Sequence, residues 1–188
     1  MTQPVGERER SFVELYERHY PAVYAYALRR TDEASARDVA AETFLVAWRR
    51  QDEVGSRELP WLLRTAQLAL RNSQRAGRRQ QRTAGRLATE PAVLVEDPAD
   101  SYDDGAAVRV ALLALSGEDR ELLRLVAWEQ LDNAAVAAVL GCSTGTAAVR
   151  LHRARRRLRR ALAVTRAPDG PRPPAPPDPT PTTRKAAR

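Results

Sequence analysis

The stretch that decides the fold runs from Asn133 to Arg160 and reads NAAVAAVLGCSTGTAAVRLHRARRRLRR. It begins as a short apolar helix pattern that stops at Gly141, a residue whose lack of a Cβ suits the left-handed turn between two helices. Ser143 follows where a hydroxyl can cap the next helix. Ala137, four residues before the glycine, is small enough to let the two helices approach closely. This stretch therefore predicts a helix-turn-helix.

Arginine dominates one side of the second predicted helix, and small or apolar residues form the other side. A helix fits the major groove of B-DNA, where its N-terminal turn meets base edges and later cations meet phosphates. The buried stripe is expected to contain Ala147, Leu151, Ala154, Leu158 and Ala161. We expect the groove to be read by Thr146, Val149, Arg150, His152 and Arg153, and the phosphates to be held by Arg156, Arg157, Arg159 and Arg160.

Charge is distributed unevenly along the 188 residues, which carry 31 Lys+Arg against 24 Asp+Glu, a formal net charge of +7. Seven arginines and no acid lie from Trp61 to Arg86, and eight arginines and no acid lie from Asn133 to Ala167. Between them, the segment from Leu87 to Val108 carries six acids and no base. A helix face that serves only solubility would have glutamates among its arginines. The two basic blocks therefore favour a nucleic-acid partner over a merely solvated surface.

Composition also marks the domain boundaries. The acidic segment contains Pro91, Pro98 and Gly105 and has no helical periodicity, so it is predicted to be a flexible linker. The eight prolines from Pro168 to Pro181 predict an extended, disordered tail. We expect a helical domain at residues 8–86, an acidic linker at 87–108, a helix-turn-helix domain at 109–166 and a Pro-rich tail at 167–188.

The rest of the chain follows a helical pattern. Apolar residues recur at three- and four-residue steps within 12–23, 39–48 and 62–69, and no alternating β-branched run competes with them. Ser-x-x-acid signatures pair Ser35 with Asp38 and Ser116 with Asp119, and each predicts a helix start in which the hydroxyl satisfies a free amide and the acid reaches back. The predicted fold class is all-α, with two small helical domains joined by the flexible acidic linker.

Residue counts exclude several kinds of site. With one cysteine, Cys142, there is no internal disulfide, multi-cysteine zinc site or iron–sulfur cluster. Only His19 and His152 remain for acid–base or metal chemistry, and His152 has no second ligand near it in the sequence. We expect no metal, no cofactor and no enzymatic activity. No stretch approaches the roughly 20 apolar residues that cross a bilayer, so we expect a soluble, cytoplasmic protein without a membrane partner.

The first domain offers two candidate binding surfaces. Its basic block suits single-stranded nucleic acid, because bases stack on aromatic rings while arginine follows the backbone, although we expect Trp48 and Trp61 themselves to pack in the core. Asp38 and Glu42 lie four residues apart on the face opposite the apolar positions. Two acids without a nearby histidine are a poor catalytic pair, so we expect them to contact a basic partner.

Four motifs, in this order, resemble those of the extracytoplasmic-function sigma factors, the short initiation subunits of bacterial RNA polymerase within the sigma-70 family. The motifs are LYERHYPAVYAYA at 15–27, DVAAETFLVAW at 38–48, WLLRTAQLALRN at 61–72 and GCSTGTAAVRLHRARRRLRRAL at 141–162. The resemblance covers most of the chain and implies two helical domains, the second with a helix-turn-helix of the sigma region 4 type.

The resemblance also implies partners and site residues. Core polymerase would be bound through the clamp helices of its largest subunit and through its flap, with Asp38 and Glu42 at the clamp. The loop expected from Gln51 to Pro60 and the helix expected from Trp61 onward would hold flipped-out bases of the melted minus-ten strand, and an anti-sigma factor is a further expected partner. Minus-ten contacts are expected from Arg64, Arg71, Arg75, Arg78 and Arg79, and minus-thirty-five contacts from Ser143, Thr146, Val149, Arg150, His152, Arg153, Arg156 and Arg157.

Three other functional classes remain open at this point. A helix-turn-helix regulator would bind duplex DNA by itself, usually as a dimer, but would need neither a second basic block nor the Asp38/Glu42 face. An enzyme acting on nucleic acid would need a metal cluster or an activated nucleophile, and the sequence offers neither. A helical scaffold would use its arginines for acidic protein partners.

Overall fold

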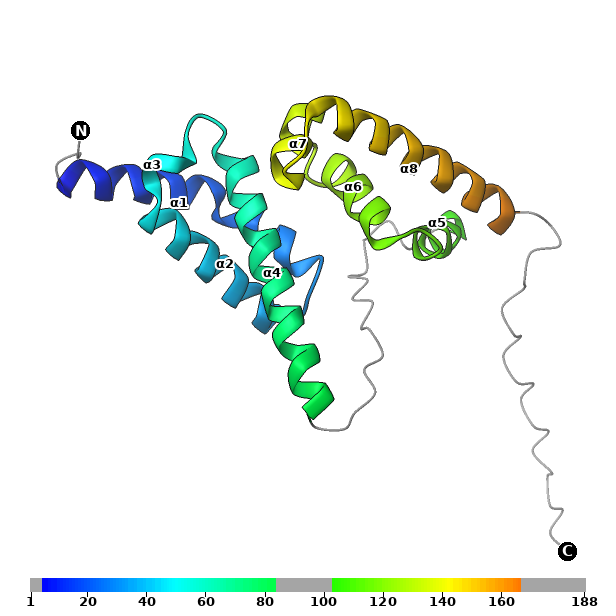
Figure 1. Ribbon diagram of the computed structural model, residues 1–188, viewed down its shortest axis with the longest axis horizontal. Coiled ribbons are helices and arrows are strands. Elements are labelled where there is room, and N and C mark those ends of the chain that lie inside the picture. Colours follow the sequence, from blue (N-terminus) through cyan, green and yellow to red (C-terminus); the bar gives the residue numbers. More distant parts are fainter. Residues whose placement is uncertain (1–4, 84–102, 167–188) are drawn as a thin grey trace, which may run out of the picture.

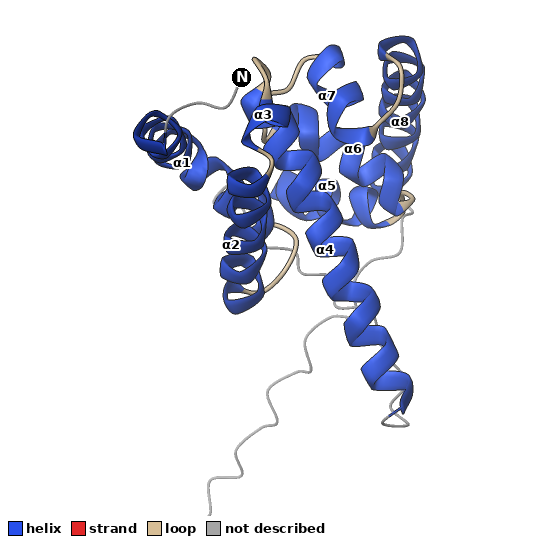
Figure 2. Cartoon of the chain, turned by 60° about the vertical axis from the view of Figure 1, so that its left-hand side comes forward, coloured by secondary structure: helices blue, strands red, loops and turns tan. Residues whose placement is uncertain are grey.

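In the computed structural model, which describes residues 5–83 and 103–166, every regular element is a helix (Figures 1 and 2). The first four helices form one group, here called the first unit, and the last four form the second unit. The first unit contains α1 (Val5–Leu28), α2 (Glu33–Arg49), α3 (Gln51–Val54) and α4 (Glu58–Thr83). The second unit contains α5 (Asp103–Leu113), α6 (Gly117–Ala127), α7 (Asn133–Leu140) and α8 (Thr144–Thr165).

The first unit is built on three mutually packed helices. Helix α1 packs against α2, and both pack against α4. Their shared core buries Tyr26, Phe44 and Leu62, which come from the three different helices. Trp61 packs against this core and Trp48 contacts the ring of Phe12, while both tryptophans keep part of their surface exposed. The predicted inward packing of the two tryptophans is thus confirmed in part.

Helix α2 starts earlier than the Ser35–Asp38 signature predicts. Its N-cap is Asp32, whose carboxylate accepts the backbone N–H of Ser35 at 3.0 Å. The hydroxyl of Ser35 also donates to Asp32, at 2.8 Å. The prediction of a cap at Ser35 is wrong because the helix starts three residues earlier, where Asp32 is an equally good N-cap residue and accepts the free amide of Ser35 itself. These hydrogen bonds to the exposed carboxylate lower the pKa of Asp32 below its ordinary value.

The second unit confirms the predicted helix-turn-helix. Helix α7 ends at Gly141, which takes the left-handed conformation with φ 66°. Helix α8 begins after Ser143, whose hydroxyl accepts the backbone N–H of Thr146 at 3.1 Å. Along α8, the buried stripe contains Ala147, Leu151 and Ala154. Local turn chemistry and a three-to-four-residue apolar repeat were therefore sufficient to predict this motif.

The boundary before the second unit differs from the expectation. Helix α5 begins at Asp103 and therefore includes the last six residues of the segment 87–108 that was expected to be linker. The rest of that predicted linker and the predicted Pro-rich tail lie outside the described residues.

Within the described ranges, no single helix is long and apolar enough to cross a membrane. Helices α7 and α8 meet that criterion only when they are taken together, by length and composition, and a 100° bend separates them.

The two units pack together through α4 and α7 (Figures 1 and 2). Buried residues from both units form one continuous apolar cluster. Leu63 and Leu70 contribute to it from α4, and Val136 and Val139 contribute from α7. Of the two predicted DNA-binding helices, α4 thus packs against α7, the helix that directly precedes α8.

Candidate nucleic-acid interface

Helix α8 presents the broadest exposed surface of the predicted site. Its buried stripe faces α6 and α7, which leaves the opposite side to solvent. Val149 is 51% exposed and adds apolar area to this side of the helix. The polar members of this surface are also exposed, and they are Arg150, His152, Arg153 and Arg156.

The two hydroxyl residues at the start of α8 are already hydrogen-bonded to each other. Ser143 Oγ and Thr146 Oγ1 lie 2.8 Å apart, in addition to the capping bond from the Thr146 backbone. Both side chains are nevertheless exposed. If Ser143 and Thr146 contact DNA as expected, their hydroxyls would do so while they also form the cap of α8.

Arg157 has a different environment from the other arginines of α8. Its Nη1 donates to Oδ2 of Asp119 on α6 at 2.6 Å, and the Asp119 side chain is only 10% exposed. The Ser116–Asp119 signature predicted that the Asp119 carboxylate would bind the backbone at the start of its own helix. Instead Ser116 caps α6 through the Asp119 backbone N–H, and the carboxylate binds α8. Arg157 thus holds α8 against α6 in addition to its expected role as a phosphate contact.

The basic residues of α4 differ in their surroundings. Arg71 and Arg75 are exposed. Arg78 and Arg79 also belong to α4, but their side chains are not among those that the structure describes. Arg64 reaches the second unit, where its Nη1 donates to the backbone oxygen of Ala138 at 3.1 Å. The expected minus-ten face of α4 is therefore partly occupied by α7 in this arrangement.

An open pocket brings the two basic faces together. Arg71 of α4 lines it with Arg150 and Arg153 of α8. Glu118 and Glu121 of α6 lie in the same pocket and partly balance the positive charge. The sequence predicted both basic helices, but it gave no sign that they would face a common space.

The acidic face of α2 is found as expected. Asp38 and Glu42 are both exposed, and Leu45, one turn further along the same helix, is 48% exposed. Sequence reasoning missed Leu45 because it was counted neither with the apolar core positions nor with the charges. Its spacing of three residues from Glu42 was the signal that could have found it. The three side chains form a mixed acidic and apolar surface.

Ionic contacts fix the segment between α3 and α4. Gly55 takes φ 57°, a conformation that favours glycine, and the chain then enters α4 at Glu58. The Glu58 carboxylate lies 2.7 Å from Nε2 of His19 and accepts from Arg18 at 2.8 Å. These two contacts, with His19 the stronger influence, lower the pKa of Glu58 below its ordinary value. The predicted base-holding segment is thereby tied to α1.

Comparison with known protein families assigns each unit to a family. Residues 15–82 match the family model described as "Sigma-70 region 2", and residues 105–158 match the one described as "Sigma-70, region 4". The ECF RNA polymerase sigma factor SigL of Mycobacterium tuberculosis is 32% identical over 160 residues, which cover 81% of this chain and 90% of SigL. This chain belongs to the extracytoplasmic-function sigma factors. The RNA polymerase sigma-E factor of Streptomyces antibioticus is 39% identical over 72 residues, covering 38% of this chain and 40% of that protein.

Solved structures agree with this assignment. The sigma factor RpoE of Bartonella quintana, in complex with the anti-sigma factor NepR, superposes with a TM-score of 0.65 at 27% identity, covering 82% of this chain and 98% of that one. CnrH, in complex with the cytosolic domain of CnrY, superposes with a TM-score of 0.54 at 25% identity, covering 82% and 89%.

The family assignment decides between the functional classes. The sigma factor directs RNA polymerase to promoters, and a stand-alone helix-turn-helix regulator is not favoured because the first unit is a sigma region 2. Sigma factors are non-enzymatic regulators of transcription. In the part of the chain that the structure describes, no group of three or more His, Cys, Asp or Glu side chains is arranged to hold a metal ion.

Proposed function

We propose that the sigma factor binds the clamp helices of core polymerase through the surface formed by Asp38, Glu42 and Leu45. The two carboxylates are exposed one turn apart, and no described cation forms an ion pair with either of them. Leu45 supplies the apolar area that an acidic patch alone lacks. Because burial of apolar surface on binding is favourable and complementary charges fix the docking register, Leu45 is expected to contribute affinity and the two acids orientation.

The DNA contacts are proposed to divide between the two basic helices. Arg71 and Arg75 of α4, together with Arg64, Arg78 and Arg79, would follow the melted minus-ten strand. Helix α8 would enter the major groove at the minus-thirty-five element, with Arg150 and Arg153 at base edges and Arg156 and Arg157 at phosphates. Around the groove-reading arginines, Ser143, Thr146, Val149 and His152 would complete the contact. The observation that carries this proposal is the exposed surface formed by Val149, Arg150, His152 and Arg153 on the side of α8 opposite its buried stripe.

An anti-sigma factor and a cellular location also belong to this proposal. Both solved relatives named above were crystallised with a partner, NepR in one case and the cytosolic domain of CnrY in the other. We extend that kind of partner to this chain, which would act in the bacterial cytoplasm, where polymerase and promoters are found. It would contribute recognition and melting without catalytic chemistry of its own.

Co-elution with core polymerase tests the proposal. Purified sigma factor is mixed with bacterial core polymerase, separated by size exclusion, and assayed by run-off transcription on a genomic promoter library. The wild-type chain is expected to co-elute and to start transcripts at a discrete set of promoters. Asp38→Lys combined with Glu42→Lys is expected to abolish co-elution, whereas Glu33→Lys, which reverses an exposed charge on the same helix, is expected to leave it unchanged. Tight duplex binding by the chain alone, without co-elution, would instead favour the stand-alone regulator.

A further inference from the structure

The open pocket between α4, α6 and α8, here called the shared pocket, is lined by arginines of both units. Arg71 comes from α4, and Arg150 and Arg153 come from α8. All three residues are exposed, and within the described ranges none of them forms an ion pair or a side-chain hydrogen bond. The shared pocket thus offers three guanidiniums that have no partner in the part of the chain that the structure describes.

The carboxylates that line the shared pocket oppose this charge only in part. Asp119 accepts from Nη1 of Arg157 at 2.6 Å, so these two residues, which both line the pocket, balance each other. Glu118 is exposed and forms no ion pair with any described residue. Of these two acids, Glu118 alone is therefore available to offset the unpaired arginines.

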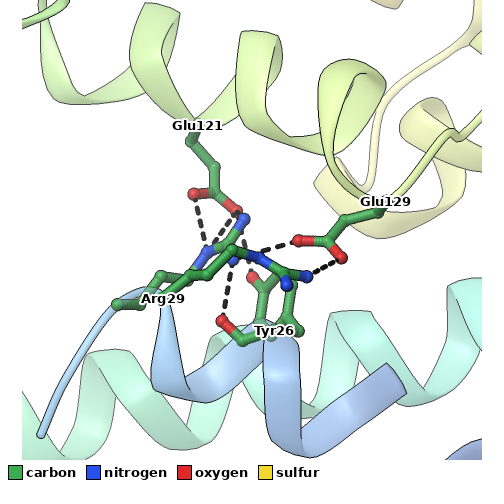
Figure 3. Close-up of polar contacts among 5 residues, drawn as sticks. Tyr26, Arg29, Glu121 and Glu129 are labelled. Carbon is green, nitrogen blue, oxygen red and sulfur yellow. Dashed lines mark hydrogen bonds and ion pairs between the residues drawn. The ribbon is translucent and has the colours of Figure 1, made fainter. Parts of the chain in front are cut away.

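Glu121, the third acid of the shared pocket, is bound by side chains of the first unit (Figure 3). Nε of Arg30 donates to Oε2 of Glu121 at 3.0 Å. Nη2 of Arg30 and the Tyr26 hydroxyl donate to Oε1 of Glu121, at 3.1 and 3.0 Å. The Arg30 side chain is only 6% exposed, and that of Glu121 is 18% exposed. Because donors of the first unit occupy both of its oxygens, Glu121 offsets Arg30 and not the arginines across the pocket.

The size of the shared pocket limits what can neutralise its charge. Its volume is about 180 Å³, and the apolar residues Leu122 and Leu140 form part of its lining. A DNA duplex is far too wide to enter, since its major groove alone is about 12 Å across. The ligand that fits this space is a small anion, which would contact α4 and α8 at the same time.

Charge and donor geometry indicate a ligand with linked phosphate groups. Three free arginines against the single free carboxylate of Glu118 leave an excess of two positive charges, which one carboxylate group cannot balance. A guanidinium binds phosphate through two parallel N–H···O bonds. Three such forks need more acceptor oxygens than a single phosphate offers, whereas two linked phosphates offer enough oxygens and enough charge.

We propose that the shared pocket binds a diphosphate, either as the free ion or as the diphosphate of a nucleotide, which bridges Arg71 of the first unit and Arg150 and Arg153 of the second. The site itself rests on the pocket and its unpaired cations. Its consequence rests on the proposed function: because Arg150 and Arg153 are also assigned to minus-thirty-five DNA, the diphosphate and the promoter duplex compete for them.

Calorimetry with the full chain tests the site directly. Inorganic pyrophosphate is titrated into the purified protein in the absence of divalent cations, and it is expected to bind at a single site. Arg71→Gln and Arg153→Gln are each expected to weaken binding at least about tenfold, because each removes a hydrogen bond between charged groups. Absence of saturable binding by the wild-type chain would overturn the proposal.

Matched controls separate a defined site from general attraction to a basic protein. Arg75→Gln on α4 and Arg155→Gln on α8 remove the same charge from the same helices, at exposed residues that do not line the pocket. They are expected to leave the affinity within about twofold of wild type. Equal losses in the pocket variants and these controls would overturn the site. If circular dichroism shows that Arg71→Gln loses helicity, Arg150→Gln takes its place.

Removal of the unpaired carboxylate provides a test in the opposite direction. Glu118→Gln is expected to tighten pyrophosphate binding by about threefold, because it removes the one acid of the pocket that has no described partner. Glu33→Gln, which removes an exposed carboxylate from α2, is expected to leave the affinity unchanged. Weaker binding by Glu118→Gln would overturn the assignment of an anion to this pocket.

Related phosphates identify the class of ligand. Inorganic phosphate, AMP and ADP are titrated in the same way, and pyrophosphate and ADP are expected to bind more tightly than phosphate and AMP. Tighter binding of ADP than of pyrophosphate would identify a nucleotide as the ligand, and the reverse order would identify the free ion; both orders support the site. AMP binding as tightly as ADP would overturn the assignment to a diphosphate.

Competition with DNA tests the consequence of binding. Association of a fluorescein-labelled duplex with the full chain is measured by anisotropy at low salt, with and without saturating pyrophosphate. Pyrophosphate is expected to weaken duplex binding by the wild-type chain at least about fivefold more than binding by Arg71→Gln, since the added ionic strength acts equally on both chains. Equal weakening would overturn the competition. Failure of both chains to bind the duplex would refute the proposed DNA-binding role of α8, while calorimetry would still decide whether the diphosphate site exists.

Discussion

The carboxylate of Asp119 binds Arg157 across the second unit, with 2.6 Å between Oδ2 and Nη1. Asp119 is almost buried at the start of α6, while Arg157 lies on the long helix α8 and is 57% exposed. The pair fixes the angle of α8 against α6 at a point well beyond the helix-turn-helix itself. Helix α8 is therefore tied to α6 through an arginine that we also assign to a DNA phosphate.

Loss of this pair is expected to destabilise the second unit. Asp119→Asn should lower the free energy of unfolding by about 1 kcal/mol, because a charged hydrogen bond is lost while the exposed arginine can still be hydrated. Urea denaturation followed by circular dichroism measures the change. Glu118→Gln, its exposed neighbour, serves as the control and is expected to have little effect. Equal stabilities for Asp119→Asn and wild type would show that the pair contributes nothing measurable.

Two arginines of α8 are expected to differ in what they read. In the holoenzyme, Arg153→Ala should cost about 1 to 3 kcal/mol at particular minus-thirty-five base pairs if Arg153 contacts a base, as we propose. Arg156→Ala should weaken binding evenly across promoters and reduce its salt dependence if Arg156 contacts a phosphate, as we propose. Run-off transcription from promoters with single-base changes distinguishes the two. A uniform loss of transcription across all promoters with Arg153→Ala would indicate that Arg153 contacts the DNA phosphate backbone instead of a base.

Substitution of Gly141 should be costly for two separable reasons. Gly141→Ala is expected to destabilise the chain by about 1 to 2 kcal/mol from the left-handed backbone alone, and the new Cβ would also force the end of the Arg64 side chain to shift away from the turn. Combining it with Arg64→Ala removes this close contact, and Arg64→Ala alone measures the loss of the Arg64 hydrogen bond to Ala138. A thermodynamic cycle of the two single variants and the double variant should therefore give a favourable interaction energy. Strict additivity would mean that Arg64 does not contact the turn in solution.

Acid is expected to weaken the contact of Glu58 with α1. Because the folded-state pKa of Glu58 lies below its ordinary value of 4.5, its contribution is present above about pH 4.5 and is lost as the pH falls through the folded pKa. Glu58→Gln should therefore reduce stability at pH 7, by at most about 1 kcal/mol for this partly exposed contact. The difference from wild type should shrink as the pH falls below 4.5. Urea midpoints at pH 7 and at acidic pH measure it, and a constant difference would contradict the assignment.

Local chemistry made much of the fold predictable. Gly141, Ser116 and Ser143 act within a few residues of themselves, so their roles at helix ends could be predicted from spacing alone. The cap of α2 was misplaced for a related reason, since Asp32 and Ser35 are both good N-cap residues and only the backbone geometry decides between them. The onset of α5 at Asp103 was missed because Gly105 and the acidic composition of the segment indicate a linker, whereas the helix includes that glycine.

Long-range pairing was not predictable from the sequence. Nothing near Asp119 indicates that its partner is Arg157, and nothing near Tyr26 indicates Glu121, because these contacts depend on how helices are placed in three dimensions. Arginine spacing likewise predicted that Arg64 belongs to a basic face but not that it would bind the end of α7. The sequence therefore predicted which helices carry basic and acidic faces. The structure was needed to show which side chains of different helices contact each other.

Trp128 lies at the seam between the units, where the guanidinium of Arg29 comes within 6.0 Å of its ring and that of Arg124 within 5.3 Å. The other two tryptophans, Trp48 and Trp61, both belong to the first unit. With those two replaced by phenylalanine, the remaining indole becomes an intrinsic optical reporter at the boundary, because its emission responds to the cation and to water entering the seam. The protein thus carries its own fluorescent probe for following separation of its halves in real time, without any added label.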